Sequence, residues 1–183
     1  MNADAHLNLD AIRMAELKRA MGGFATGVTI VATSHGGADY GMTCNSFNTV
    51  SLDPPLVLWS VRKQSASRAA FTGSSGYTVS VLGSHQQALA ERFTHGAPTE
   101  RFDGVGTTRL PTGRVRLDDA VSWFDCTLEQ VVGAGDHDVL IGRVIAFAAG
   151  AGEPLVYVHG GFTAPLRAAS REVATASGRP VRR

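Results

Sequence analysis

The sequence predicts a mainly β protein, an antiparallel barrel that is closed or nearly closed and carries a few helices on its outside. At least six segments have the spacing or the apolar character of strands, and most are joined by short turns. These segments are not separated regularly by helices of about 10–15 residues, which a doubly wound parallel sheet would require. The two observations therefore favour a barrel over a layered α/β fold.

Two kinds of pattern mark the predicted strands. Apolar and small polar residues alternate over residues 28–33 and 124–128, which is typical of a strand with one buried face. The nearly unbroken apolar run Leu56–Val61 indicates a strand buried on both faces. The predicted strands cover residues 28–33, 40–43, 56–61, 77–82, 124–128, 139–147 and 155–159.

Three helices are predicted around the barrel. The first has its apolar residues on one face, and the second begins at Ser65, a residue type that favours helix starts. Ser84 followed three residues later by Gln87 has the spacing of a capping box and starts the third. The long connection over residues 94–112 is rich in Gly, Pro and Thr, which is typical of functional or mobile segments. The predicted helices cover residues 9–21, 65–71 and 84–93.

The composition and the charge restrict the class of protein. With 44% apolar and 18% charged residues the chain is globular, and a net charge of +1 argues against a basic surface for nucleic acid. The longest apolar run, residues 139–149, contains Arg143 and is too short to cross a bilayer. The first residues, which include Asp4 and Asp10, lack the basic flank and the apolar stretch of a signal peptide. We therefore expect a cytoplasmic protein that binds neither nucleic acid nor membrane.

One domain is expected over residues 1–166, because no linker or repeat divides the chain. Residues 167–183 contain five arginines and one glutamate and are predicted to form a flexible basic tail. The two cysteines, Cys44 and Cys126, are far apart and lack the spacing of a disulfide framework or a zinc site, so no metal site is predicted. The chain also lacks the GxGxxG, GxxxxGK[ST], HExxH and GxSxG motifs, so a bound nucleotide would need another architecture.

The most informative segment is polar and runs from Gly41 to Pro55 between two predicted strands. Its small hydroxyl and amide side chains offer many hydrogen-bond donors beside its backbone N–H groups. Such a loop suits a large planar ligand rimmed with polar atoms, for example the isoalloxazine ring of a flavin. Cys44 is expected to be a small filler beside the ring, because no second cysteine is adjacent. The candidate contacts are Met42, Thr43, Cys44, Asn45, Ser46 and Ser51.

A second polar segment, residues 60–67, combines two cations with several hydroxyls just before a predicted helix. The start of a helix presents unpaired N–H groups, and Arg62 or Lys63 can add charge-assisted bonds to a phosphate. Taken alone, this pattern favours a polar strand end followed by a capped helix. Together with the polar loop upstream, it predicts a flavin phosphate site. The candidate contacts are Ser60, Val61, Arg62, Lys63, Ser65 and Ser67. Phe93 is a further candidate that could flank the ligand, although its place at a helix end favours a core aromatic.

The sequence Gly135-Asp136-His137-Asp138 lies between two predicted strands. A hairpin turn alone would account for its glycine and aspartates. Beside a flavin, however, the His137 imidazole can hydrogen-bond the nicotinamide carboxamide or the flavin edge, or supply a proton. The carboxylate of Asp136 or Asp138 can orient the imidazole ring of His137. We therefore predict His137 as the catalytic residue, with Gly135 and Asp136 as cofactor contacts.

The order and spacing of these motifs resemble the short-chain flavin reductase family over roughly residues 13–163. The matching segments are residues 24–29, 41–47, 50–55, 126, 135–137, 154–157 and 160–162. The resemblance implies a six-stranded antiparallel split barrel with peripheral helices, usually a homodimer with the flavin at its interface. It also implies that residues 42–46 contact the ring and ribityl chain, that residues 60–67 hold the phosphate, and that His137 lies on the nicotinamide side. Phe162 stands where many relatives have a tyrosine.

The resemblance implies an NAD(P)H:flavin oxidoreductase, in which hydride passes from the nicotinamide to FMN or FAD and the reduced flavin is supplied to a partner monooxygenase. The sequence leaves open FMN against FAD and NADH against NADPH. Two alternatives remain beside it. An oxidase of the pyridoxamine-phosphate-oxidase type would need more basic residues for its substrate phosphate than Arg143, the main cation beyond His137, supplies. A non-enzymatic flavin- or haem-binding module on the same barrel would bind without turnover.

Overall fold

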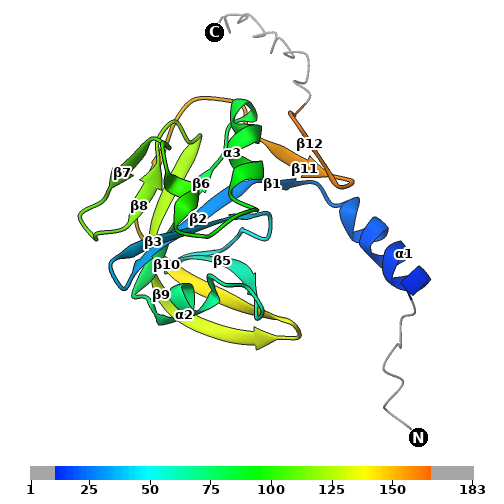
Figure 1. The fold of residues 1–183 in the computed structure, drawn as a ribbon, viewed down its shortest axis with the longest axis horizontal. Helices are drawn as coiled ribbons and strands as arrows, with labels where there is room; N and C mark the ends of the chain where they lie inside the picture. Colours follow the sequence, from blue (N-terminus) through cyan, green and yellow to red (C-terminus); the bar gives the residue numbers. More distant parts are fainter. Residues whose placement is uncertain (1–10, 166–183) are drawn as a thin grey trace, which may run out of the picture.

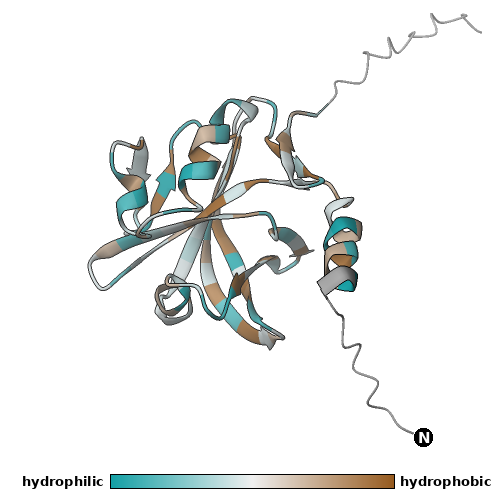
Figure 2. Ribbon diagram, turned by 45° about the vertical axis from the view of Figure 1, so that its right-hand side comes forward, coloured by the Kyte–Doolittle hydropathy of each residue, from teal (hydrophilic) through white to brown (hydrophobic). Residues whose placement is uncertain are grey.

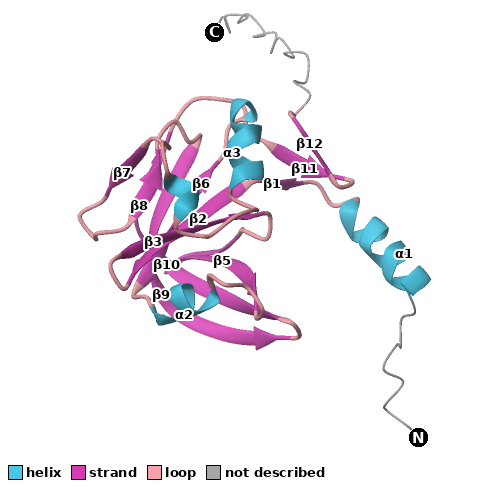
Figure 3. Cartoon of the chain, viewed as in Figure 1, coloured by secondary structure: helices cyan, strands magenta, loops and turns pink. Residues whose placement is uncertain are grey.

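The computed structural model describes residues 11–165, with side chains from residue 13 onward. Antiparallel strands form the body of this part, and short helices lie outside it (Figure 1 and Figure 3). The predicted basic tail, residues 167–183, lies outside the described residues, as does the start of the first predicted helix. The prediction of a mainly β barrel with peripheral helices is confirmed.

The largest sheet within the described residues has seven antiparallel strands in the order β3-β2-β6-β9-β10-β5-β4. Its two edge strands, β3 and β4, follow one another in the chain. The turn of residues 45–47 between them therefore lies where the barrel is split. The strands are β2 (Thr29–His35), β3 (Ala38–Cys44), β4 (Asn48–Leu52), β5 (Pro55–Arg62), β6 (Gly76–Val81), β9 (Ser122–Ala134) and β10 (His137–Ala149).

The sheet curls around a cluster of buried side chains to which β2, β3, β5, β6, β9 and β10 all contribute. Trp59 and Tyr77 are fully buried at its centre, with ring centroids 5.7 Å apart in an edge-to-face arrangement. Gly142 is required beside them, since a Cβ there would lie 2.4 Å from the Tyr77 hydroxyl oxygen. Burying each large side chain contributes about 1.5–3 kcal/mol, so this cluster holds the barrel closed.

Smaller elements cover the barrel. Strands β1 (Thr26–Gly27), β11 (Val156–Val158) and β12 (Gly161–Thr163) form a separate three-stranded sheet, and β7 (Thr107–Arg109) pairs with β8 (Val115–Leu117). The strand predicted at residues 155–159 therefore pairs outside the barrel. The helices are α1 (Ala11–Gly22), α2 (Arg68–Gly73) and α3 (Gln87–Arg92), with 3-10 turns η1 (Ser84–Gln86) and η2 (Glu100–Phe102). Helix α1 stands clear of the barrel, and Figure 2 shows apolar residues along it as well as on the barrel strands.

The predicted loop between residues 41 and 55 is in part a strand, which raises the main sheet from the six expected strands to seven. Residues 48–52 form β4, which pairs with β5 through Asn48 opposite Leu58 and Leu52 opposite Pro55. Four of the five β4 residues are exposed, because β4 is an edge strand that leaves the core. Its sequence therefore lacks the alternation that burial of one face would impose.

Helices α2 and α3 each begin three residues later than predicted. Helix α2 begins at Arg68 rather than Ser65, because the Ser65 N–H donates to the Arg62 carbonyl (2.9 Å) and closes a turn first. The expected pairing of Ser84 with Gln87 is also absent. Instead the Gln86 side-chain oxygen accepts from the Gly83 N–H at 2.9 Å, because a 3-10 turn precedes α3.

Candidate functional site

The two polar segments meet at the split of the barrel. The Ser60 N–H, near the end of β5, donates to the Ser46 hydroxyl in the turn after β3 at 2.9 Å. Between the two strand ends lies a cavity of about 510 Å³, which we call the β3–β5 cavity. Its wall consists of Met42, Thr43, Cys44, Asn45, Ser46, Ser60, Arg62, Gln64, Ser65 and His137. Most of the predicted ligand contacts are therefore brought together, and Gln64 joins them unpredicted.

Arg62 is the cation on this wall that remains available for a ligand. Its guanidinium is exposed at the end of β5 and forms no ion pair or hydrogen bond with the described residues. Neighbouring cations are occupied: Arg68 is paired with Asp138, and Arg143 Nε donates to Glu129 at 2.7 Å. The pairing of Arg143 removes the cation that the pyridoxamine-phosphate-oxidase alternative needed for its substrate phosphate.

The polar side chains from the end of β3 differ in what they can offer a ligand. Thr43 is engaged by the end of α3, since its hydroxyl donates to the Ala90 carbonyl at 2.6 Å. The Asn45 amide is exposed and has no hydrogen bond within the described residues. Asn45 therefore presents two donors and one acceptor at the mouth of the cavity.

Cys44 is built into this wall as a protonated thiol. Its side chain is 6% exposed, and its sulfur lies 3.1 Å from the Ser46 hydroxyl oxygen. Burial raises the pKa of the Cys44 thiol, which keeps it in the unreactive form near neutral pH. The geometry fits the predicted role of a small filler.

His137 opens β10 directly opposite Arg62 in the strand register. Its Nδ1 lies 2.7 Å from an Asp136 carboxylate oxygen, and this contact lowers the pKa of the Asp136 carboxyl. Asp138 is buried against Arg68, so Asp136 is the aspartate that holds the imidazole. With Nδ1 turned to Asp136, the second ring nitrogen remains for a ligand in the cavity.

The structure does not place the other predicted contacts on this wall. The side chains of Val61 and Phe93 are fully buried, and the Phe93 ring packs edge-on against Phe102 at 5.0 Å. Ser67 is buried at the start of α2, where its side chain faces the core rather than the cavity. The residues off the wall are Ser51 in β4, Val61, Ser67, Phe93, and three residues at the β9–β10 turn, Lys63, Gly135 and Asp136.

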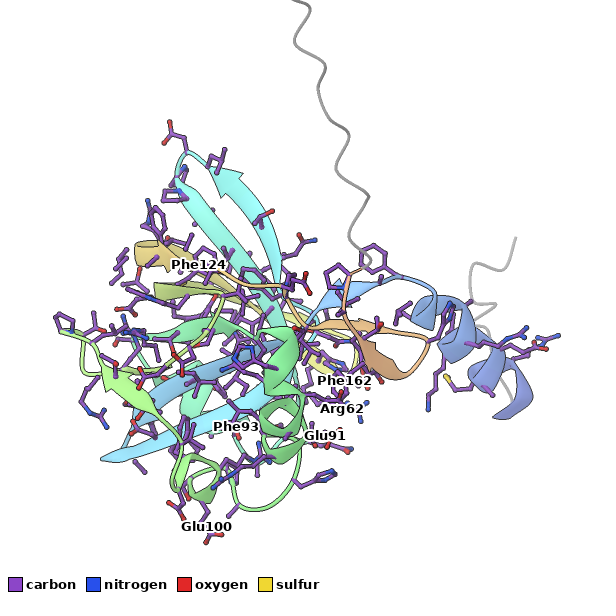
Figure 4. The ribbon with its side chains drawn as sticks, turned by 90° about the horizontal axis from the view of Figure 1, so that it is seen from above. Arg62, Glu91, Phe93, Glu100, Phe124 and Phe162 are labelled. Atoms are coloured by element: carbon purple, nitrogen blue, oxygen red, sulfur yellow. The ribbon has the colours of Figure 1, made fainter. Side chains whose placement is uncertain are left out.

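An adjoining cavity of about 370 Å³ was not predicted. It shares Thr43 and Asn45 with the β3–β5 cavity and is lined further by Val28, Glu91, Thr94, Tyr157, Gly160 and Phe162. Tyr157 and Phe162 pack edge-to-face across β11 and β12, with ring centroids 5.3 Å apart. In Figure 4, Arg62, Glu91 and Phe162 are labelled on the same side of the molecule. The two cavities together form a groove with a cationic end and an aromatic end.

This donor set fits a flavin. A flavin combines a planar ring, whose edge carries carbonyl and N–H groups, with a phosphate at the end of a flexible chain. The free Asn45 amide matches the ring edge, and the unpaired Arg62 guanidinium matches the phosphate. Within residues 11–165 no helix is long and apolar enough to cross a membrane, and no three potential metal ligands are grouped together.

The fold and the groove define a split-barrel protein built to bind a nucleotide-like cofactor. The sequence profile of the flavin reductase like domain matches residues 21–165. The chain belongs to this flavin reductase like family.

Relatives and solved structures agree with that assignment. The chain is 37% identical to the reductase subunit HsaB of a flavin-dependent monooxygenase from Rhodococcus jostii, covering 89% of this chain and 84% of that protein. It is 37% identical to the FMN reductase (NADH) SmoA of Agrobacterium fabrum, over 79% of this chain and 82% of that protein. The structure of the NADH:FAD oxidoreductase SgcE6 of Streptomyces globisporus superposes with a TM-score of 0.83 at 32% identity, covering 87% and 97%. The chain spans about half the length of two other curated relatives, 51% and 53%.

Proposed function

We propose that the protein oxidises NADH to reduce FMN or FAD and supplies the reduced flavin to a partner monooxygenase. The observation that carries this proposal is the Ser60–Ser46 hydrogen bond, which brings both polar segments to one cavity beside an unpaired Arg62. The activities named for the relatives support the donor, the flavin and the type of partner. We assign the protein to the cytoplasm, where its two free cysteines remain reduced.

The residues of the groove divide the binding of two ligands. Arg62 binds the flavin phosphate, and the Asn45 amide orients the edge of the ring. The Asp136 carboxylate holds the imidazole of His137, whose free nitrogen hydrogen-bonds the nicotinamide carboxamide. Bound flavin would supply the redox chemistry, as the acceptor of the hydride that the nicotinamide donates. No protein nucleophile is required, which agrees with the protonated Cys44.

The activity is tested by mixing the purified protein with NADH and free FMN or FAD and following the nicotinamide absorbance. Continuous NADH oxidation that depends on added flavin is the expected result. Flavin that binds but is not reduced by NADH would instead indicate a binding module. Oxidation of a pyridoxine phosphate with oxygen, and without NADH, would indicate the oxidase alternative.

Replacing His137 with alanine is expected to raise the KM for NADH about fivefold while leaving the flavin dissociation constant unchanged. The reason is the loss of one hydrogen bond to the nicotinamide, worth about 1 kcal/mol. Steady-state kinetics and flavin fluorescence titration measure the two quantities. His35→Ala is the matched control, because His35 is exposed at the far end of β2. An unchanged KM in His137→Ala would remove His137 from the nicotinamide site.

We further propose that two copies of the chain form a homodimer. Helix α1 stands clear of the barrel, yet Met14, Leu17 and Met21 on one of its faces are 40%, 41% and 67% exposed. An isolated helix of this length is marginal in water, so α1 needs a packing partner. Phe24, next to it, is 76% exposed. Met21 and Phe24 also line a cavity of about 360 Å³ that includes Asn45 and Ser46, so a second copy would border the flavin groove.

The dimer is tested by sedimentation equilibrium, with an expected mass of about twice the 19.2 kDa of the chain. Met21→Glu is expected to shift the protein toward the monomer and to weaken flavin binding, because it places a charge in the interface. Glu16→Lys, on the opposite face of α1, is the control and should leave the mass unchanged. A monomer at micromolar concentration would contradict the proposal.

A further inference from the structure

Lys63 contacts the β9–β10 turn through both its backbone N–H and its side-chain ammonium. Its backbone N–H donates to the Asp136 carbonyl at 2.9 Å, and its ammonium Nζ donates to the Gly135 carbonyl at 2.7 Å. These are consecutive carbonyls of one turn. The ammonium therefore contacts the turn, although the sequence predicted that it would bind the flavin phosphate.

The turn that Lys63 holds is otherwise exposed. Gly135 has a φ of +57°, the left-handed conformation that glycine adopts readily, and the Asp136 side chain is 88% exposed. Residues 131–136 are all exposed, so the tip of the β9–β10 hairpin lacks support from the core. A clamp from the end of β5 restricts the movement of such a hairpin tip.

The position of the turn determines the position of His137. His137 follows the turn directly, and the Asp136 carboxylate fixes its Nδ1. Arg62 and Lys63 are neighbours in the chain but serve different places: Arg62 lines the β3–β5 cavity, whereas the Lys63 side chain reaches the turn. We propose that Lys63 is a positioning residue, which holds the β9–β10 turn so that His137 faces the nicotinamide, and that Arg62 alone of the two binds the flavin phosphate.

This inference rests on the proposed role of His137. It predicts different effects for substitutions of the two adjacent cations, Arg62 and Lys63. Lys63→Met keeps the aliphatic side chain and the backbone N–H contact but removes the ammonium. It is expected to raise the KM for NADH about three- to tenfold, the effect of losing a hydrogen bond that orders the site. The flavin dissociation constant should remain unchanged. Lys63→Arg keeps a cationic donor and should restore the KM.

The experiment compares Lys63→Met, Lys63→Arg and Arg62→Met in the full chain. Three readouts are needed: the KM for NADH, the flavin dissociation constant, and the imidazole resonances of His137 in a ¹H–¹⁵N spectrum assigned with His137→Ala. We expect Lys63→Met to move the His137 resonances and the KM, and Arg62→Met to move the flavin dissociation constant. The resonances report the surroundings of the imidazole independently of turnover.

Two results would overturn the proposal. One is a flavin dissociation constant that rises in Lys63→Met as much as in Arg62→Met, which would make Lys63 a phosphate ligand. The other is an unchanged His137 resonance in Lys63→Met. A shifted resonance together with a normal KM in His137→Ala would instead refute the proposed role of His137 and leave the clamp of the turn intact.

Discussion

Replacing Asp125 with alanine is expected to lower the free energy of unfolding by about 3–5 kcal/mol. The side chains of Arg114 and Asp125 are only 6% and 2% exposed, and Arg114 Nε donates to an Asp125 carboxylate oxygen at 2.7 Å. The other carboxylate oxygen accepts from the Thr112 hydroxyl at 2.7 Å. Without Asp125, the Arg114 charge stays buried with no opposite charge, and the connection after α3 loses its anchor on β9.

Urea denaturation of the variant and of the parent protein measures this loss. Glu129→Ala is the matched control, because it breaks the Arg143–Glu129 pair, whose side chains are 42% and 38% exposed. Exposed pairs of this kind contribute about 0–1 kcal/mol. Equal losses of unfolding free energy in the two variants would show that the buried pair contributes no more to stability than the exposed pair.

Replacing Arg62 with methionine is expected to raise the flavin dissociation constant about 10- to 100-fold. A hydrogen bond to a charged group is worth about 1.5–3 kcal/mol, and Arg62 is the cation on the wall of the β3–β5 cavity that makes no hydrogen bond or ion pair in the described part of the chain. Because the phosphate carries the charge, riboflavin, which lacks it, should bind the variant and the parent equally.

Fluorescence titration with FMN and with riboflavin measures the effect. Arg143→Met is the control, because Arg143 is paired with Glu129 away from this cavity. A weakened affinity for riboflavin as well would assign Arg62 to the fold or to the ring. An unchanged affinity for FMN would remove Arg62 from the phosphate site.

The barrel could be predicted because burial leaves a pattern in the sequence. The apolar run Leu56–Val61 and the alternation over residues 28–33 correctly marked β5 and β2 as strands. The predicted burial of their faces was wrong: only alternate residues of β5 are buried, whereas residues 29–33 of β2 are buried on both faces. Strand β4 and the three-residue strand β12 have no such pattern. β4 is an exposed edge, and β12 is too short for a period to repeat.

The site was predicted in composition but not in detail. Polar residues around Asn45 and Arg62 indicated the two strand ends. The tertiary structure determines which of these side chains face the cavity. Whether Arg62 or Lys63 faces the cavity depends on how β5 ends and on the register that sets His137 opposite Arg62. Glu91 and Phe162 reach the groove from α3 and β12, and no local pattern in the sequence joins these elements.

The most direct measurement is a crystal structure of the protein with FMN bound. We expect the phosphate within hydrogen-bond distance of the Arg62 guanidinium, and the edge of the ring beside Asn45 in the groove between β3 and β5. Flavin bound at another surface, with the Arg62 side chain in solvent, would contradict the assignment of this groove as the flavin site.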